Sequence, residues 1–468
     1  MTGRHSSVLG SKVNEESRGC RGSRRSFRTG VESVVTLFLY NLFFLFAFLL
    51  YLPFYAVHLL RRGGLGWAFL QRFGLFGPGI RSVLRALKQP VWVHAVSVGE
   101  TVAALGFIRR LQERNPGRPV VLSVTTTTAY DLASRKAPGG VTSIYCPLDF
   151  WPCVRRVLAL VRPALLVIFE VEIWPNLILL TAGGGIPVVL VNGRMSDRSG
   201  QGYTRWSGFF GRLFRAFRVI CMQTSEDAGR VRPLAGDAVT VAVCNTMKFD
   251  QVPDTDGKDK SAALNEAFGA GERLVLCAGS THPGEEEMAC DALLALKPEF
   301  PSLRLVLVPR HHERAAAVER VLQDRKLSYR LLLPTAGREP SPAPVDVLVV
   351  NTTGELMNFY AACEVAYVGK SLAGNEGGHN IIEPAIFAKP ILHGANMQNF
   401  RAVAAVFQEA GAAVQVEDAK GFTPALRQLL ASPQERQTLG ARARRVVETS
   451  RGAIDRTLDL IEPWLGKP

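Results

Sequence analysis

The sequence predicts an α/β protein with two domains built on parallel sheets, preceded by a segment long enough to enter a membrane. Three observations predict this. Short runs rich in Val, Ile and Leu alternate with amphipathic helical stretches from residue 91 onward. A polar stretch near residue 254 interrupts the alternation, which then resumes. The stretch 33–60 contains no Asp, Glu, Lys or Arg. A length of 468 residues agrees with two domains of ordinary size.

The first domain is predicted at residues 90–253. Its buried strands are expected in VWVHAV, VVLSVTT, ALLVIFE, PVVLVNGR, VICMQTS and VTVAVCN. Helical stretches such as TVAALGFIRRLQER lie between them. Strands that alternate with helices in this way form parallel βαβ units. The alternation therefore predicts one doubly wound sheet in this half of the chain.

The second domain is predicted at residues 271–450, after a linker at residues 254–270 that is rich in Asp, Lys, Pro and Gly. Its strands are expected in RLVLCAGS, LRLVLVPR, VDVLVVNT, VAYVGKS and KPILHGA. Residues 451–468 are expected to form a terminal helix. Asp254 and Asp256 form an Asp-x-Asp pair inside the linker, where solvated charge is a better interpretation than a metal site.

Composition limits the partners of the protein. The formal net charge of +14 favours an anionic partner, such as a membrane surface or a phosphorylated substrate. Nucleic acid is not expected, because the chain has neither zinc-finger spacing nor an aromatic RNA-binding run. The eight cysteines are scattered, which favours reduced thiols over a disulfide framework.

The N-terminal region divides into two segments. Residues 1–32 are basic and rich in Ser and Gly, and we expect them to be disordered. Residues 33–60 are predicted to be a membrane anchor, since about 20 apolar residues span a bilayer. A buried core helix and a monotopic insertion bent at Pro53 remain alternatives, and a cleaved signal peptide lacks its exit site here. Basic residues flank both ends, so they do not decide the orientation.

Residues that follow strands are the candidates for chemistry, because ligands of open parallel sheets bind beyond the carboxyl ends of the strands. Glu100 follows the first strand and begins a helix; it is either a general base or only the acid of a capping box. Glu170 and Glu172 end an apolar strand and are either a site or a solvated strand end. Lys248 is either a surface residue or a cation for a leaving phosphate.

The second half offers an anion site by the same argument. Arg310 follows a buried strand directly and suits bidentate phosphate contact. The adjacent His311 and His312 do not predict a metal, because no other ligand falls at a known spacing. A Gly-rich loop runs from Gly369 to a helix expected near Asn380, and Glu383 is placed to accept hydrogen bonds from ribose hydroxyls. This loop matches neither a P-loop nor a GxGxxG dinucleotide motif.

Taken in order, these motifs resemble those of the Kdo transferases, which add 3-deoxy-D-manno-octulosonic acid (Kdo) to lipid A in Gram-negative bacteria. The resemblance covers residues 35–465. Eight motifs carry it, namely HAVSVGE, FEVEIWPN, NGRMS, MKFD, STHPGEE, LVLVPRH, TGEL and GGHNIIEP. It implies a GT-B fold, in which two Rossmann-like domains enclose a deep interdomain cleft, with the acceptor in the first domain and the donor CMP-Kdo in the second.

The resemblance also implies a reaction and the residues that perform it. Kdo is transferred to a phosphorylated lipid A precursor, lipid IVA, with inversion and without a metal or other cofactor. Glu100 is implied as the base, with Glu170 and Lys248 stabilising the transition state on the acceptor side. The residues implied for CMP binding are Pro309, Arg310, Thr353, Gly354, Glu355, Asn380, Ile381, Ile382 and Glu383. The implied location is the inner membrane, in contact with membrane lipids, with the catalytic domains on the cytoplasmic face.

Two positions depart from the family pattern. Asn351 stands where Gly followed by Asp is common, and Lys370 replaces a Gly beside the expected donor site. Two alternative functions remain open. One is a transferase or epimerase of the same fold that uses another nucleotide sugar, and the other is a membrane-tethered binding protein without activity. The sequence does not fix how many Kdo units are added.

Overall fold

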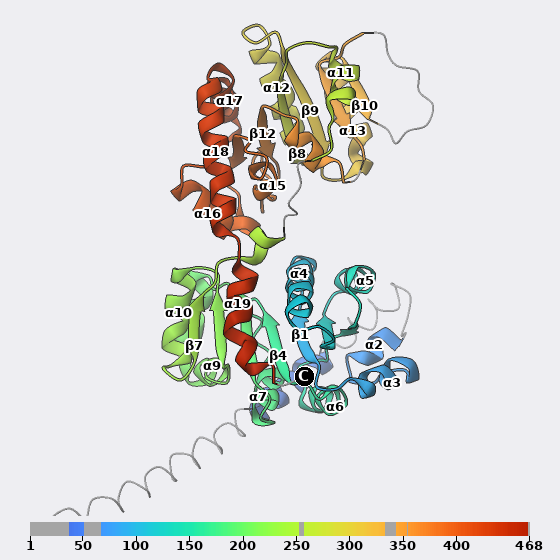
Figure 1. The fold of residues 1–468 in the computed structure, drawn as a ribbon, viewed down its shortest axis with the longest axis vertical. Helices are drawn as coiled ribbons and strands as arrows, with labels where there is room; N and C mark the ends of the chain where they lie inside the picture. The colour runs from blue at the N-terminus through green and yellow to red at the C-terminus, as the bar shows by residue number, and fades with distance from the viewer. Residues whose placement is uncertain (1–36, 51–66, 252–256, 333–342, 353, 467–468) are drawn as a thin grey trace, which may run out of the picture. The chain divides into compact units, whose positions relative to one another are not determined.

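The computed structural model describes residues 37–50, 67–251, 257–332, 343–352 and 354–466. The chain forms two compact units (Figure 1). Unit 1 comprises Met1–Cys244 together with Ile454–Pro468, and unit 2 comprises Asn245–Ala453. Each unit contains one seven-stranded parallel sheet, which confirms the predicted α/β class with parallel sheets.

Unit 1 has the strand order β3-β2-β1-β4-β5-β6-β7. Its strands are β1 (Val91–Ala95), β2 (Val120–Val124), β3 (Val141–Tyr145), β4 (Leu165–Phe169), β5 (Val188–Gly193), β6 (Val219–Met222) and β7 (Thr240–Val243). Its helices are α2 (Trp67–Gln71), α3 (Pro78–Ala86), α4 (Val98–Arg114), α5 (Thr127–Lys136), α6 (Trp151–Val161), α7 (Pro175–Gly183), α8 (Asp197–Arg205), α9 (Ser207–Phe214), α10 (Ser225–Ala235) and α19 (Ala453–Ile461). A helix also spans residues 37–50.

Unit 2 has the strand order β10-β11-β9-β8-β12-β13-β14. Its strands are β8 (Leu274–Thr281), β9 (Leu303–Pro309), β10 (Tyr329–Leu332), β11 (Val347–Val350), β12 (Val365–Val368), β13 (Ile391–Gly394) and β14 (Val414–Val416). Its α-helices are α11 (Ser261–Phe268), α12 (Glu285–Leu296), α13 (Ala315–Asp324), α14 (Leu356–Ala361), α15 (Ile382–Ala385), α16 (Arg401–Glu409), α17 (Ala419–Ala431) and α18 (Pro433–Ser450). Short 3₁₀ turns include η1 (Met247–Asp250) and η3 (Gln398–Phe400).

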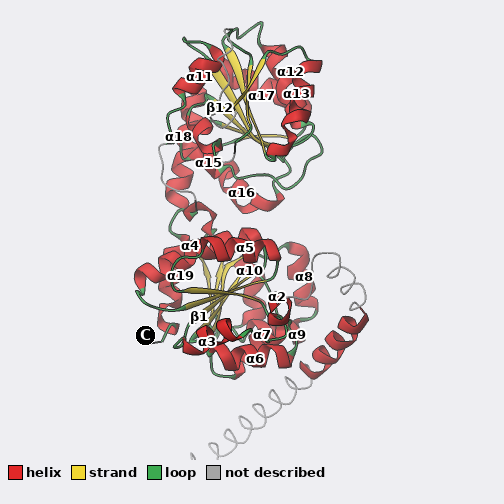
Figure 2. Ribbon diagram, turned by 90° about the vertical axis from the view of Figure 1, so that its right-hand side faces the viewer, coloured by secondary structure: helices red, strands yellow, loops and turns green. Residues whose placement is uncertain are grey.

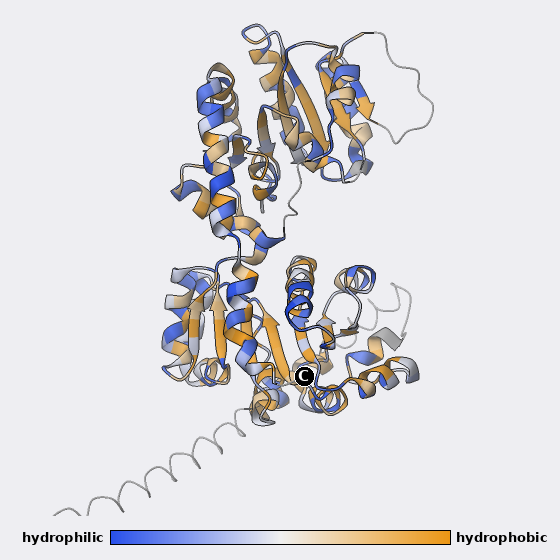
Figure 3. Cartoon of the chain, in the orientation of Figure 1, coloured by the Kyte–Doolittle hydropathy of each residue, from blue (hydrophilic) through white to orange (hydrophobic). Residues whose placement is uncertain are grey.

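The apolar strands form the core of each unit. Strands β1, β2 and β4 are buried along their whole length, because helices cover both faces of a parallel sheet (Figures 2 and 3). In unit 2 the strands divide two hydrophobic clusters, one on each face of the sheet. The continuous Val, Ile and Leu runs that predicted these strands are therefore the residues that hold the layers together.

The predicted linker differs from the structure, whereas the predicted terminal helix is present but its packing was not predicted. Residues 261–268, inside the expected linker, form α11 and bury Leu264 and Phe268 in the core of unit 2. The end of the chain returns to unit 1 as α19, where Asp455 pairs with Arg110 and Arg114 at 2.8 Å each. Neither feature is visible in local composition, because both depend on contacts with residues far away in the sequence.

The predicted basic tail lies outside the described residues, as do parts of the predicted anchor. Of that anchor, residues 37–50 are described, and they are helical. Within the part of the chain that the structure describes, no helix is both long and apolar enough to cross a membrane. Several large apolar side chains of this helix face outward all the same, among them Phe43, which is 73% exposed, and Leu50, which is 71% exposed.

Close packing in unit 2 gives a test of the fold. A Cβ added at Gly440 in α18 would collide with the backbone oxygen of Ala388. We expect Gly440→Ala to lower the free energy of unfolding by about 1–3 kcal/mol, because neither backbone can easily move. As a control, Gly229→Ala in α10 meets open space and should raise it by about 0.5–1 kcal/mol through helix propensity. Urea unfolding followed by circular dichroism measures both; equal effects would contradict this packing argument.

Candidate functional site

The strand order places one switch point in each sheet, where neighbouring strands send their connections in opposite directions. In unit 1 this point lies between β1 and β4, and in unit 2 between β8 and β12. Ligands of doubly wound folds bind in the crevice at such points, beyond the carboxyl ends of the strands. The residues that follow these four strands are therefore the ones to examine first.

Glu100 follows β1 at the start of α4 and forms a complete capping box there. Its carboxylate accepts hydrogen bonds from the backbone N–H of Val96 at 2.8 Å and from the Ser97 hydroxyl at 2.8 Å. Glu100 is buried. The capping interpretation is thus realised, and the same bonds hold the carboxylate at the carboxyl end of β1. Capping and a role as a base are compatible, because a carboxylate has lone pairs beyond those used here.

Glu170 and Glu172 follow β4 and complete a group of three carboxylates with Glu100. Burial first, and then the charges of Glu100 and Glu170, raise the pKa of Glu172 to about 7. The two glutamates were predicted to end an apolar strand, but both lie beyond it. The strand ends at Phe169, and Glu170 adopts a left-handed conformation with φ of 54°. Arg194, after β5, approaches Glu170 at 3.8 Å.

Unit 2 is organised around the buried carboxylate of Glu285, the first residue of α12. It accepts hydrogen bonds from the Tyr367 hydroxyl at 2.7 Å and from the backbone N–H groups of His282, Lys370, Ser371 and Leu372 at 2.8–3.1 Å. One side chain thereby joins the loop after β8 to the loop after β12, the two loops that flank the switch point. The sequence analysis did not predict this role.

A cluster of three histidines lies beside this junction. The Nε2 atoms of His282 and His379 are 3.2 Å apart, and His282 also makes an edge contact with the ring of His311. Burial first, and then Arg310, lower the pKa of His379 to about 3, so its imidazole is neutral at pH 7. With Lys370 also nearby, this region favours an anion over another cation. Among the described residues, no group of three or more His, Cys, Asp or Glu could hold a metal ion.

The Gly-rich loop leads to Asn380 and Glu383. Gly377 and Gly378 both have positive φ, and an added Cβ would collide with Asn399 and Met397 respectively. Asn380 donates to the Glu383 carboxylate at 3.3 Å. Burial raises the pKa of Glu383 to about 7, although Asn380 and Arg310 act in the opposite direction.

The predicted helix at the end of this loop is short, because α15 contains only residues 382–385. Ile381 and Ile382 are fully buried in the core of unit 2. Their side chains anchor the loop, so any contact of theirs with a nucleotide must come through the backbone. Arg310 is exposed at the end of β9, and Pro309 is half-buried beside it.

The TGEL segment is described in part. Thr353 lies outside the described residues, and Gly354 has a positive φ of 86°. Glu355 pairs with Lys260 at 2.6 Å, and this contact is the main reason that the pKa of Glu355 is lowered. Asn358 also donates to Glu355 at 2.8 Å. Lys260 comes from the expected linker, and no local motif marks it as a partner of this segment.

Lys248 lies in unit 2 rather than on the acceptor side, where the sequence analysis placed it. It belongs to η1, after the chain has left β7, and its amine donates to the backbone oxygen of Asn399. The amine also lies 4.2 Å from the centre of the Phe400 ring. Asn399 in turn donates through its backbone to Gly377 at 2.8 Å. Lys248 is therefore connected to the Gly-rich loop through Asn399.

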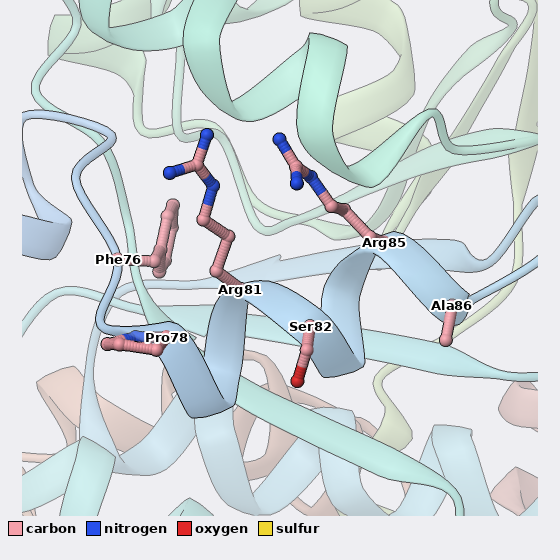
Figure 4. Close-up of a pocket in the computed structure, with 6 residues that line it drawn as sticks. All are labelled: Phe76, Pro78, Arg81, Ser82, Arg85 and Ala86. Carbon is pink, nitrogen blue, oxygen red and sulfur yellow. The ribbon is translucent and has the colours of Figure 1, made fainter.

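A separate cavity of about 700 Å³ lies against α3 in unit 1. It is lined by Phe76, Pro78, Arg81, Ser82, Arg85 and Ala86. Figure 4 shows Arg81 and Arg85, one helical turn apart, extending their guanidinium groups toward the same side. None of the predicted site residues lines it, so it is distinct from the carboxylate group.

Comparisons with known proteins agree with these features. Residues 68–251 match the family model described as 3-Deoxy-D-manno-octulosonic-acid transferase (kdotransferase). The 3-deoxy-D-manno-octulosonic acid transferase of Bordetella pertussis is 35% identical, over 87% of this chain and 94% of that protein. The enzyme of the same name from Haemophilus influenzae is 30% identical, over 84% of this chain and 91% of that protein.

Solved structures support the fold alone. A glycosyltransferase from Rickettsia africae covers 81% of this chain and 100% of its own, with a TM-score of 0.54 at 10% identity. MurG from Acinetobacter baumannii covers 80% of this chain and 100% of its own, with a TM-score of 0.52 at 15% identity. The coverage and identity of the sequence relatives decide the family, and this chain belongs to the Kdo transferases, a family of glycosyltransferases.

Proposed function

We propose that this protein transfers Kdo from CMP-Kdo to the phosphorylated lipid A precursor lipid IVA, with inversion and without a metal. The observation that carries the proposal is the group of Glu100, Glu170 and Glu172 at the switch point of unit 1. Membership of the Kdo transferase family supports the sugar that is transferred. The relatives' printed names give the sugar only, so the donor nucleotide and the acceptor are part of the proposal.

Glu100 is the proposed base on the acceptor side. The acceptor hydroxyl gives its proton to the carboxylate while its oxygen bonds to the anomeric carbon of Kdo, and the bond from that carbon to the phosphate oxygen breaks. The capping box holds Glu100 in place for this step, since Ser97 and Val96 both donate to its carboxylate. Glu170 and Glu172 add negative charge that stabilises an oxocarbenium-like transition state.

Unit 2 is the proposed donor domain. Arg310 and Lys370 supply positive charge for the CMP phosphate, and the neutral imidazoles of His282 and His379 supply hydrogen bonds. Glu383 accepts hydrogen bonds from the ribose hydroxyls, which is the role that its position in the sequence predicts. Lys248 contacts Asn399, which contacts Gly377, and these contacts support a stabilising role for Lys248 on the side of the leaving nucleotide.

The inner membrane is the proposed location, with both units on its cytoplasmic face. The outward apolar side chains of residues 37–50 support contact with membrane lipids. Arg81 and Arg85 on α3 support attraction to anionic headgroups, which is worth about 1 kcal/mol for each basic residue near the surface.

Mass spectrometry of the lipid product tests the donor and the acceptor together. The purified full chain is incubated with CMP-Kdo and lipid IVA, and we expect the acceptor mass to rise by one or more Kdo residues. The number of additions answers a question that the sequence leaves open. Release of nucleotide from a UDP-sugar, with none from CMP-Kdo, would instead support another nucleotide-sugar enzyme.

The role of Glu100 is separable from its capping interaction. We expect Glu100→Gln to reduce turnover at least about a hundredfold, because the base is lost. Ser97→Ala removes the same capping box but keeps the carboxylate, and should cost about 1 kcal/mol of stability with only a few-fold loss of turnover. Steady-state kinetics with CMP-Kdo measures both variants. Near-normal turnover of Glu100→Gln would refute the assignment of the base.

The raised pKa of Glu383 makes a prediction about nucleotide affinity. Ribose hydroxyls donate to the ionised carboxylate, so protonation of Glu383 opposes binding. With a pKa of about 7, the ionised fraction falls about tenfold between pH 8 and pH 6. We expect the affinity for CMP to fall by a similar factor, and Glu383→Gln to bind CMP more weakly with this part of the pH dependence removed. Calorimetry of both proteins measures the difference, since titration of the CMP phosphate is common to both. Parallel pH profiles would contradict the role of Glu383.

A further inference from the structure

The helix of residues 37–50 packs against the rest of unit 1 through buried hydrogen bonds. Asn41 donates to Asn176 at 2.9 Å and accepts from it at 3.1 Å, and the backbone N–H of Trp151 donates to Asn41 at 3.0 Å. The Tyr40 hydroxyl donates to Asp149 at 2.8 Å. Phe44 stacks on Phe150 with ring centres 6.0 Å apart. These bonds fix the rotation of the helix, because buried amides are costly to leave without partners.

Two of these polar residues, Asp149 and Asn176, also hold the first turn of α7 in place. Asp149 accepts from the backbone N–H groups of Asn176 at 3.1 Å and Leu177 at 2.8 Å, in the first turn of that helix. Asn176 also donates to the backbone oxygen of Asp149 at 2.6 Å. The helix of residues 37–50 thus lies on the outside of unit 1 and is joined to the start of α7 (Figure 2).

A groove of about 370 Å³ runs between this helix and helices α6 and α7. Leu42 and Leu45 line it on one side, and Phe150 and Leu180 line it on the other. Asn41, with its amide engaged by Asn176, also contributes to the lining. A groove with apolar walls and this volume is within the range of small-ligand sites.

The lining of the groove includes one positive charge. Arg155 of α6 is the one charged side chain that lines the groove in the described part of the chain. Its guanidinium lies 5.7 Å from the centre of the Trp151 ring, and both side chains are exposed. Apolar walls with a single arginine match a ligand that has a hydrocarbon chain and an anionic head.

The groove also lies at the sheet edge that carries the carboxylate group. Asn176 and Trp151 line it near the carboxyl ends of β4 and β3, since each begins a helix that follows one of those strands. Glu170 and Glu172 occupy the short connection between β4 and α7. A lipid held in the groove therefore lies at the same edge of the sheet as the candidate catalytic residues, and this position favours the acceptor over a bilayer lipid as occupant.

We propose that this groove holds one acyl chain of the lipid acceptor, with Arg155 contacting the phosphorylated headgroup. The inference rests on the proposed function, and it assigns to the helix of residues 37–50 a second task beside contact with the membrane. That helix forms one wall of the acceptor site. The acyl chain gains affinity from apolar burial, and an acceptor without acyl chains loses that gain.

A substitution that fills the groove tests the proposal. Leu180→Trp in the full chain should raise the KM for acylated lipid IVA about tenfold or more, because the indole occupies the space of the chain. Transfer to the same headgroup with its acyl chains removed should stay within twofold. The ratio of kcat/KM between the two acceptors is the decisive quantity, because a general loss of stability lowers both values together.

Phe43→Trp is the matched control, since Phe43 lies on the same helix but is 73% exposed and outside the groove. It should leave the ratio unchanged. Direct binding of acylated lipid IVA to each variant in detergent micelles is measured alongside, and should weaken about tenfold in Leu180→Trp only. The proposal for the groove would be overturned if Leu180→Trp left both the kcat/KM ratio and the binding of lipid IVA unchanged. It would also be overturned if the substitution weakened only the association of the protein with lipid vesicles. Wild-type protein that binds the lipid but transfers to neither acceptor would instead sink the proposed function.

Discussion

The arrangement of loops in unit 2 depends on one buried carboxylate. Glu285 accepts five hydrogen bonds, four from backbone N–H groups and one from Tyr367. Those bonds bring the loop after β8 against the loop after β12, and they leave no room for a side chain at Gly369, where a Cβ would lie 2.8 Å from the carboxylate. Ser371, held by Glu285, then accepts from the N–H of Gly394 in β13 at 2.8 Å. Removing this carboxylate would leave several buried donors unpaired at once, each costing about 1–3 kcal/mol.

The three consecutive glutamates of α12 show what sequence patterns do and do not predict. They occupy the first turn of the helix. Their separate tasks were not predicted from the sequence. Glu285 holds the two loops, Glu286 forms a buried pair with Arg314 at 2.7 Å, and Glu287 accepts from the N–H of Gly284 at 2.7 Å. Successive helical residues point about 100° apart, so identical neighbours meet different surroundings, and only the tertiary contacts decide which task each performs.

Unit 1 shows the same limit of prediction from sequence. Its strands were predictable because a strand buried on both faces is a continuous apolar run, and Glu100 was singled out because it begins the helix that follows such a run. The membership of Lys248 in unit 2, the pairing of Lys260 with Glu355 and the contact of Asn41 with Asn176 were not predictable. Each of these depends on where the chain goes between residues that are distant in sequence, and no local pattern carries that information. Sequence order thus predicts the positions of site residues along the strands better than it predicts their partners.

The two glutamates with a pKa of about 7 show how the same shift leads to different chemistry. Burial is the main cause for both Glu172 and Glu383. The next contributions have opposite signs. Two further carboxylates raise the pKa of Glu172, whereas Asn380 and Arg310 lower that of Glu383. Under the proposed function, a developing positive charge beside Glu172 draws it into the ionised state, and hydroxyl donors do the same for Glu383. In each unit a carboxyl group of the candidate site has a pKa close to neutral pH, where the charge of a bound ligand decides its ionisation.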